Sequence, residues 1–217
     1  MIKDFNQYLL QKTGNNYGVK KIRPRLILEF LEEKFRKPIE FTINIPSSNI
    51  GSLTMLEALL INCLLQISSA KKIFEFGTFL GYTTHILAKN SNANSLVYSL
   101  DLGPNLENNT FSPESILEDD INNDNYLKEL QSKNGAFFLS SLEKQASQKV
   151  KLIHENSFFL DIKSLNLTEE IDFIFVDGGH TYENIENDTK LAEQMSRRPT
   201  IVVWHDFDSK IHTGVTE

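Results

Sequence analysis

Lys72-Ile-Phe-Glu-Phe-Gly-Thr-Phe-Leu-Gly-Tyr-Thr-Thr84 decides the fold of this chain of 217 residues. Ile73–Phe76 is a short apolar run with one polar interruption, which predicts a buried strand. The glycine turn, residues 77–81, follows directly, and a helix is expected over Thr83–Asn90. A strand, a glycine turn and a helix N-terminus together form a cradle for a ligand, because glycine lets the backbone turn tightly and approach closely.

Glu75 stands just before the glycine turn and determines its electrostatics. An acid at the mouth of a phosphate site would repel its ligand, whereas an acid beside a cationic or hydroxyl-bearing ligand would help to bind it. The dinucleotide fingerprint G-x-G-x-x-G and the phosphate-loop pattern G-x-x-x-x-G-K-[ST] are both absent. A plain strand-to-helix turn, with glycines used only for packing, is the alternative at this point.

Four further apolar runs predict the other strands of a mostly parallel sheet. They are Leu96–Leu100, Val150–His154, Asp172–Val176 and Thr200–Trp204. A buried helix is expected before them at Leu53–Ile67, and helical or loop segments separate the later strands at Phe158–Leu165 and Tyr182–Met195. Strands that alternate with helices indicate an α/β, Rossmann-like, doubly wound domain with helices on both faces of the sheet.

The chain divides into a lead-in over residues 1–52 and the main domain over residues 53–217. The lead-in is polar and partly helical, with a helix expected at Leu26–Phe35. In the first helix of the main domain, Thr54 and Glu57 have the spacing of a capping box. An insertion at about residues 103–149 contains two possible helices, at 126–131 and 136–144. It is either a lid over the sheet edge or a disordered acidic segment.

Composition excludes several classes of protein. A net charge of −7 argues against nucleic acid and anionic membranes as partners, since either would require a basic face. Cys63 is the sole cysteine, so no intrachain disulfide can form, and its apolar surroundings predict an inert core thiol. The N-terminus lacks the layout of a signal peptide, and Leu53–Ile67 is too short to span a bilayer. We expect a cytoplasmic protein without membrane contact.

The ends of the predicted strands carry the chemistry. In a doubly wound sheet the ligand lies beyond the carboxyl ends of the strands, and all five predicted strands end in polar residues. Asp101 lies roughly twenty residues beyond the glycine turn, where a carboxylate can accept both hydrogens of a ribose diol. A surface acid is the alternative for Asp101. Asn156 and Ser157 end the third strand, where N-capping of a helix explains them equally well.

The fourth and fifth strands end in acids and histidines, within Asp177-Gly-Gly-His-Thr-Tyr182 and Trp204-His205-Asp206. The two glycines allow the chain to turn so that Asp177 and His180 face one cavity. Neighbouring strand ends lie one strand spacing apart, so Asp177 and Asp206 could hold one divalent cation. Carboxylates suit Mg²⁺, whereas a contribution from His205 shifts the preference toward Mn²⁺ or Fe²⁺.

These motifs resemble those of known enzymes. Glu-x-Gly-x-x-x-Gly-x-x-Thr, residues 75–84, resembles the first motif of class I S-adenosylmethionine-dependent methyltransferases, and this resemblance implies strand order 3-2-1-4-5. Asp-Gly-x-His-x-Tyr followed by His-Asp resembles the metal-dependent O-methyltransferases. The cofactor-binding positions that the resemblance implies are Glu75, Gly77, Thr78, Gly81, Thr84, Asp101, Asn156, Ser157 and Asp177. Asn156 departs from the family, because many members have an acid there.

The same resemblance implies methyl transfer from S-adenosylmethionine to a hydroxyl of a small molecule, assisted by Mg²⁺ or Mn²⁺. The metal would be held by Asp177, His205 and Asp206, and His180 would take the substrate proton. Relatives often have a carboxylate in place of His205, so its role as a ligand is the weakest of the three. Cephalosporin hydroxylase-like proteins share the pattern, and a degenerate domain that binds the cofactor without turnover is a second alternative. Glu75 and the missing dinucleotide fingerprint argue against an oxidoreductase.

The fold of these methyltransferases normally continues beyond the fifth strand with a helix and two more strands. This sequence stops at Glu217, so we expect those last two strands to be missing. A sheet without them would expose an edge, and a homo-oligomer could cover that edge.

Overall fold

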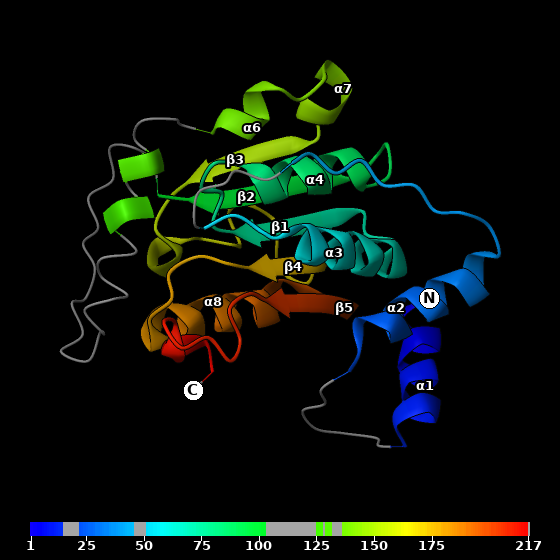
Figure 1. Ribbon diagram of the computed structural model, residues 1–217. Coiled ribbons are helices and arrows are strands. Elements are labelled where there is room, and N and C mark those ends of the chain that lie inside the picture. The colour runs from blue at the N-terminus through cyan, green and yellow to red at the C-terminus, as the bar shows by residue number, and fades with distance from the viewer. Residues whose placement is uncertain (15–21, 46–50, 103–124, 128, 132–135, 217) are drawn as a thin grey trace.

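The computed structural model describes residues 1–14, 22–45, 51–102, 125–127, 129–131 and 136–216. Five parallel strands form one sheet in the order β3-β2-β1-β4-β5, which confirms the predicted order (Figure 1). The strands are β1 Lys72–Phe76, β2 Leu96–Asp101, β3 Val150–His154, β4 Ile171–Val176 and β5 Ser196–Trp204. All arrowheads point to the left in Figure 1, so the carboxyl ends of the strands share one edge.

Helices cover both faces of the sheet. The longer ones are α1 Ile2–Thr13, α2 Pro24–Phe35, α3 Met55–Ser68, α4 Tyr82–Asn90 and α8 Tyr182–Met195. The shorter ones are α6 Phe137–Ser140, α7 Lys144–Ser147 and the 3₁₀ turns η1 Ser157–Phe159 and η2 Thr213–Val215. Side chains of α3 and α4 form one core with one face of the sheet, and those of α8 form a second core with the other face. Helices α1 and α2 pack on the outer side of α3.

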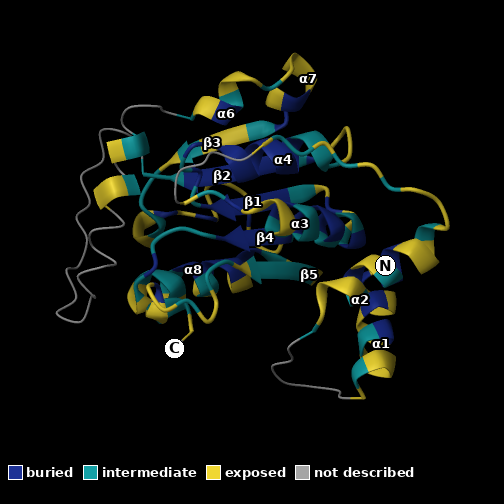
Figure 2. Cartoon of the chain, in the orientation of Figure 1, coloured by how far each residue is buried: buried dark blue, intermediate teal, exposed yellow. Residues whose placement is uncertain are grey.

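Alternation along the strands explains why both faces are filled. Ile73 of β1 and Phe173 of β4 belong to the core under α3 and α4, whereas Phe74 and Ile174 belong to the core under α8. All four side chains have an exposed fraction of 0%. Each buried side chain of this size contributes about 1.5–3 kcal/mol to folding. Figure 2 shows the same pattern, with β1, β2 and β4 buried and β5 only half-buried.

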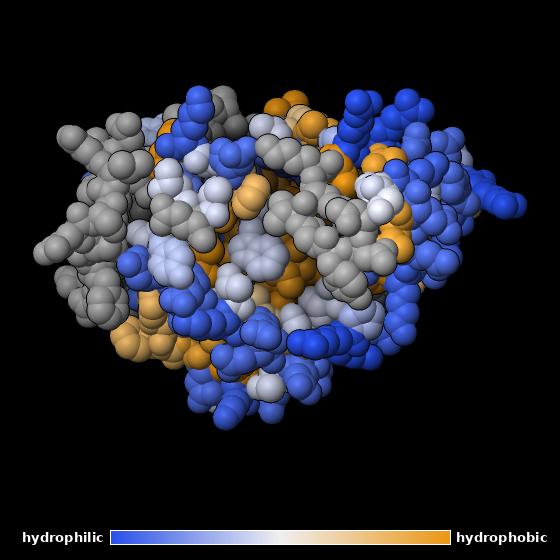
Figure 3. Space-filling model, turned by 90° about the horizontal axis from the view of Figure 1, so that it is seen from below, coloured by the Kyte–Doolittle hydropathy of each residue, from blue (hydrophilic) through white to orange (hydrophobic). Residues whose placement is uncertain are grey.

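Strand β5 is an edge of the sheet and begins earlier than predicted, at Ser196. Pro199 lies within it, which an edge strand tolerates because one side needs no ladder hydrogen bond. Seen from below, on the β5 side, hydrophobic side chains show between polar rims (Figure 3). Trp204, Phe207 and Ile211, at and beyond the end of β5, are all exposed. Coverage of this edge by an oligomer stays a prediction.

Two segments that were possible helices do not form continuous helices. Residues 158–165 form only the short η1 and a turn, because Asp161 Oδ1 accepts hydrogen bonds from the backbone N–H of Lys163 and Ser164 at 3.1 Å each. Such local side-chain bonds compete with the helix. The helix expected over 136–144 is broken into α6 and α7. The hydroxyls of Ser140 and Ser141 bond the carbonyls three residues earlier, which ends the first piece.

The other predictions for helices and for Cys63 hold. The capping box of α3 is formed, with Thr54 and Glu57 bonded reciprocally. Cys63 is buried, and burial raises the pKa of its thiol to about 11, so it stays neutral. Residues 125–127 and 129–131 are helical, as expected, while most of the insertion lies outside the described residues. Among the helices that the structure describes, none combines the length and apolar character needed to cross a bilayer. The boundary between residues 52 and 53 stays a prediction.

Candidate functional site

The glycine turn joins β1 to α4 and lies against the chain that leaves β4. Gly77 has φ 89°, and a Cβ at this position would lie 2.0 Å from the carbonyl oxygen of Asp177. Gly81, the N-cap of α4, has φ 79°, and its Cβ would meet the side chain of Leu139 at 2.6 Å. Only glycine fits either position, since both the backbone angle and the available space exclude a side chain.

Glu75 lies beneath the glycine turn and is fully buried. Its Oε2 accepts hydrogen bonds from the hydroxyls of Thr84 and Ser99, and Ser99 also bonds Thr78 at 2.6 Å. Burial raises the pKa of Glu75 to about 8, and the bonds from Ser99 and Thr84 oppose that shift. The sequence placed this acid at the mouth of the site, whereas the structure shows it fixing the turn from below. Its Oε1 is buried with no hydrogen-bond partner among the described residues.

Asp101, at the end of β2, lies beside the glycine turn. Its Oδ2 accepts hydrogen bonds from the backbone N–H of Phe79 at 2.6 Å and from Gln131 Nε2 at 3.0 Å. Burial raises the pKa of Asp101, and the hydrogen bond from Phe79 opposes this. This position is compatible with ribose binding, which stays a prediction.

The end of β3 has structural tasks of its own. Asn156 Oδ1 accepts a hydrogen bond from the N–H of Phe158 at 3.0 Å and so caps η1. Ser157 Oγ accepts one from Asn187 of α8 at 3.1 Å. The capping alternative is therefore observed for Asn156. A contact with the cofactor stays a prediction for Asn156 and Ser157.

The acid–histidine cluster consists of Asp177, His180, His205 and Asp206, at the ends of β4 and β5. His205 Nδ1 lies 3.1 Å from Asp177 Oδ1 and 3.0 Å from Asp206 Oδ2. His180 Nε2 lies 3.5 Å from Asp206 Oδ2 and 3.9 Å from Asp177 Oδ1. The structure thus brings together all four residues that the sequence predicted for metal binding and proton transfer.

Charge coupling within this cluster is strong. Burial alone would lower the pKa of His205, but hydrogen bonds to Asp177 and Asp206 raise it to about 11. Burial alone would raise the pKa of both carboxyls, but the neighbouring histidines lower it. A protonated His205 therefore serves as counter-ion to two carboxylates, and a metal bound through its Nδ1 would replace that proton.

The donor atoms fit a divalent cation. One ligand atom each from Asp177, His205 and Asp206 lies within 4.8 Å of the others. Two carboxylates with one imidazole form a mixed oxygen and nitrogen set, which suits Mn²⁺ or Fe²⁺ better than an all-oxygen set does. Metal binding itself stays a prediction.

A family comparison identifies the chain. A family model described as a methyltransferase domain matches residues 74–207, which is more than half of the sequence. The chain belongs to this methyltransferase family. The match runs from β1 to the residue after Asp206 and so includes both the glycine turn and the acid–histidine cluster. No curated protein matches the chain.

Several solved structures resemble this methyltransferase domain. An O-methyltransferase from Bacillus cereus in complex with SAH is 18% identical, with 94% of this chain and 74% of that chain covered and a TM-score of 0.44. The O-methyltransferase TomG from Streptomyces achromogenes in complex with SAM is 16% identical, with 98% of this chain and 80% of that chain covered and a TM-score of 0.45. The SAH-bound methyltransferase PaMTH1 from Podospora anserina is 15% identical, with 94% of this chain and 69% of that chain covered and a TM-score of 0.47. The fold assignment rests on the observed strand order, because these likenesses are weak.

Two residues at the site of this methyltransferase domain were not predicted. Glu57 Oε1 lies 3.5 Å from His205 Nε2. The ring of His212 stacks on that of His180 with centroids 3.8 Å apart. Gly214 allows this, because a Cβ there would lie 2.6 Å from the carbonyl oxygen of His180. The capping-box spacing signalled Glu57 but not its second contact, and nothing local signals His212.

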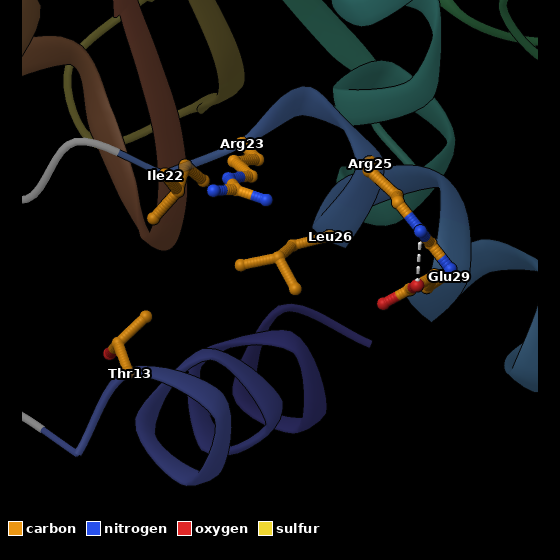
Figure 4. A pocket seen from close by; sticks show the side chains of 6 residues that line it. All are labelled: Thr13, Ile22, Arg23, Arg25, Leu26 and Glu29. Atoms are coloured by element: carbon orange, nitrogen blue, oxygen red, sulfur yellow. Dashed lines mark hydrogen bonds and ion pairs between the residues drawn. The ribbon is translucent and has the colours of Figure 1, made fainter.

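Two cavities of the described structure lie away from the acid–histidine cluster. One of about 340 Å³ is bordered by α1 and α2, at the right of Figure 1, and its lining includes Arg25 and Glu29, which form an ion pair at 2.7 Å (Figure 4). Another, of about 200 Å³, is lined by residues near the amino end of β1 such as Ser69 and Ala70. Neither contains a residue predicted for the site.

Proposed function

We propose that this chain transfers the methyl group of S-adenosylmethionine to a hydroxyl of a small molecule, assisted by a divalent metal ion. The observation that carries the proposal is the contact between its two parts. Gly77 of the glycine turn packs directly on the backbone of Asp177, the first acid of the acid–histidine cluster. A cofactor seated on the turn would therefore lie beside the cluster. Membership of the methyltransferase family supports the reaction class.

The glycine turn suits a cofactor that is cationic and rich in hydroxyl groups. Asp101, bonded to the N–H of Phe79 in the glycine turn, would accept the ribose hydroxyls, and Gly77 would allow close approach of the backbone. The carboxylate of Asp177, whose backbone packs on Gly77, gives the space next to the turn a negative charge before a metal binds, which favours a sulfonium over a phosphate. Glu75 acts mainly by fixing the turn through Thr84.

Asp177, His205 and Asp206 would hold the metal ion. A bound divalent cation would lower the pKa of a substrate hydroxyl and orient its oxygen. The net charge of −7 supports a small-molecule acceptor over nucleic acid.

His180 would take the proton of that hydroxyl. Its Nε2 lies 3.5 Å from Asp206 Oδ2, so its ring is held at the edge of the proposed metal site. General base catalysis of this kind contributes about 10²–10⁴-fold to the rate. The stacked ring of His212 fixes the orientation of His180.

Calorimetric titration with S-adenosylmethionine, with and without Mn²⁺ or Mg²⁺, tests the proposal. Formation of S-adenosylhomocysteine with a panel of sugars, phenols and polyketide alcohols then tests turnover. We expect binding by the wild-type chain, turnover with at least one class of alcohol, and at least 100-fold slower turnover for His180→Ala. No cofactor binding would refute the proposal. Cofactor binding that persists in Asp177→Ala and Asp206→Ala, with no turnover in any chain, would favour a degenerate binding domain.

A further inference from the structure

We propose that Glu57 is a positioning residue of the metal site, which holds His205 so that Nδ1 faces the cation. The inference rests on the proposed function, because it assumes a cation between Asp177 and Asp206. It makes His205 a true ligand where a carboxylate would otherwise be expected. It also assigns the site to a transition metal such as Mn²⁺ rather than Mg²⁺, because imidazole favours the former.

The two oxygens of Glu57 have separate contacts. Oε2 accepts a hydrogen bond from the backbone N–H of Thr54 at 2.7 Å, and the hydroxyl of Thr54 accepts one from the N–H of Glu57 at 3.3 Å. These two bonds complete the capping box of α3. The other oxygen, Oε1, lies 3.5 Å from His205 Nε2. The cap therefore uses only half of the carboxylate.

The imidazole of His205 lies between two sets of acids. Nδ1 faces Asp177 and Asp206 at 3.1 and 3.0 Å, while Nε2 faces Glu57. Histidines that bind metals usually donate the other ring N–H to a carboxylate, which fixes the tautomer and ring orientation and raises the basicity of the ligand. The three acids around His205 are arranged in a similar way, with Glu57 in the outer position at the distance of an ion pair.

Glu57 comes from a rigid part of the molecule. Leu53 and Ala58, on either side of the capping box, have exposed fractions of 2% and 0%. The first turn of α3 is therefore anchored in the core under the sheet, and the position of Glu57 is set by packing. A support that is fixed in this way can orient a ligand, whereas a carboxylate on a loose segment could not.

A cap alone does not require glutamate. Glutamine serves equally well at this position of a capping box. With its carbonyl oxygen on the N–H of Thr54, however, a glutamine would turn its NH₂ group toward the N–H of His205, and two donors would face each other. Glutamate is thus the residue that satisfies both Thr54 and His205.

Two variants separate the roles of Glu57. Glu57→Gln keeps the cap and removes the negative charge that faces His205. Thr54→Ala removes the hydroxyl half of the cap and keeps the carboxylate with its bond to the backbone N–H of residue 54. Affinity for Mn²⁺ and for Mg²⁺ is measured by calorimetry on the full chain, with the Mn²⁺ electron paramagnetic resonance signal as a second readout. We expect Glu57→Gln to weaken Mn²⁺ binding about 10- to 100-fold and to narrow the preference for Mn²⁺ over Mg²⁺. Thr54→Ala should lower the unfolding temperature and leave Mn²⁺ affinity within about twofold.

Each other outcome refutes the inference in a distinct way. If Glu57→Gln binds Mn²⁺ as tightly as the wild type, or if Thr54→Ala loses as much affinity, Glu57 is only a cap and the methyltransferase proposal stands. If the wild type binds S-adenosylmethionine but no Mn²⁺, both the metal site and the role of Glu57 are refuted. If it binds Mn²⁺ but not S-adenosylmethionine, the proposed function fails while the metal titrations still decide the role of Glu57.

Discussion

The glycine turn and the acid–histidine cluster share one sheet edge but differ in the charge that their acids carry in the folded state. Beneath the turn, Glu75 is fully buried, carries a raised pKa and is bonded to Thr84 and Ser99. It is therefore largely neutral at neutral pH. In the cluster, Asp177 and Asp206 keep lowered pKa values and depend on His205 for compensation. The acid at the turn is therefore neutral, whereas the acids of the cluster keep their negative charges.

This difference separates a part that is complete on folding from a part that a ligand completes. A buried neutral network stabilises one backbone conformation and needs no ion. Two carboxylates beside a protonated imidazole form a charged set that a divalent cation can enter by replacing a proton. Changes at the turn should therefore act mainly on stability, and changes in the cluster mainly on metal affinity.

The contact between the two parts gives the largest expected effect. Gly77→Ala forces a Cβ to within 2.0 Å of the Asp177 carbonyl oxygen at φ 89°, so one part must move away from the other. We expect a loss of about 4 kcal/mol or more in the free energy of unfolding, measured with urea. Gly14→Ala is the matched control, because Gly14 also has a positive φ but no atom of the described residues lies within 4 Å of its Cβ, and it should cost only about 1 kcal/mol. Equal losses would show that strain at φ, and not the contact, decides the effect.

Glu75→Gln tests the suppressed charge at the turn. Because the pKa of Glu75 is raised from 4.5 to about 8 in the folded state, its contribution to stability is complete below pH 4.5 and is lost as the pH rises through 8. Between pH 5 and pH 8 the free energy of unfolding, measured with urea, should fall for the wild type and for Glu75→Gln. The fall for the wild type should be larger by roughly 3 kcal/mol. The same loss in both proteins would mean that Glu75 is already ionised in the fold.

Asp206→Asn tests the retained charge in the cluster. Loss of a direct ligand should weaken Mn²⁺ binding about 100-fold or more, since even outer-sphere changes cost 10- to 100-fold. Affinity for S-adenosylmethionine, measured without metal, should stay within about threefold of the wild type. Asp161→Asn removes the same charge from an exposed turn and should change neither affinity. A weaker cofactor affinity without metal would show that the two parts are not independent.

The smallest effect is expected at the end of β3. Asn156→Ala removes the cap of η1 and should cost about 0.5–1 kcal/mol in the free energy of unfolding. If Asn156 also contacts the adenine edge, the affinity for S-adenosylmethionine should fall about 3- to 10-fold, the range of one hydrogen bond. We expect both effects, measured by urea unfolding and calorimetry. Unchanged cofactor binding would leave Asn156 as a cap alone.

The sequence predicted the frame of the site because the frame depends on local patterns. Apolar runs located all five strands, and the polar residues that follow β4 and β5 do form one cluster. Prediction failed where a local side chain or an edge position overrides the pattern. Asp161 forms a turn in a segment where a helix or a loop was expected, and β5 extends back to Ser196 across Pro199, a residue that usually breaks a strand.

The missed parts of the site are long-range contacts. Ser99 could have been noticed as a hydroxyl inside an apolar strand, although its bond to Glu75 crosses from β2 to β1. The second contact of Glu57 and the stacking of His212 on His180 depend on where α3 and the chain after β5 lie in three dimensions. No spacing along the chain encodes either contact.

The hydrogen bonds that join β1 to β4 affect which parts of the sheet can change during evolution. At one end, Asp172 accepts hydrogen bonds from the backbone N–H of Lys71 and Lys72; at the other, Asp177 donates its N–H to the carbonyl of Phe76. Apart from Asp172, these contacts use only main-chain atoms. Side chains beyond the carboxyl ends of β4 and β5 can therefore change without breaking these hydrogen bonds, whereas those inside the two cores that β1 and β4 share are tied to one another. Selection for a new acceptor molecule could reshape the β4–β5 half while the half that carries the glycine turn keeps its original surface.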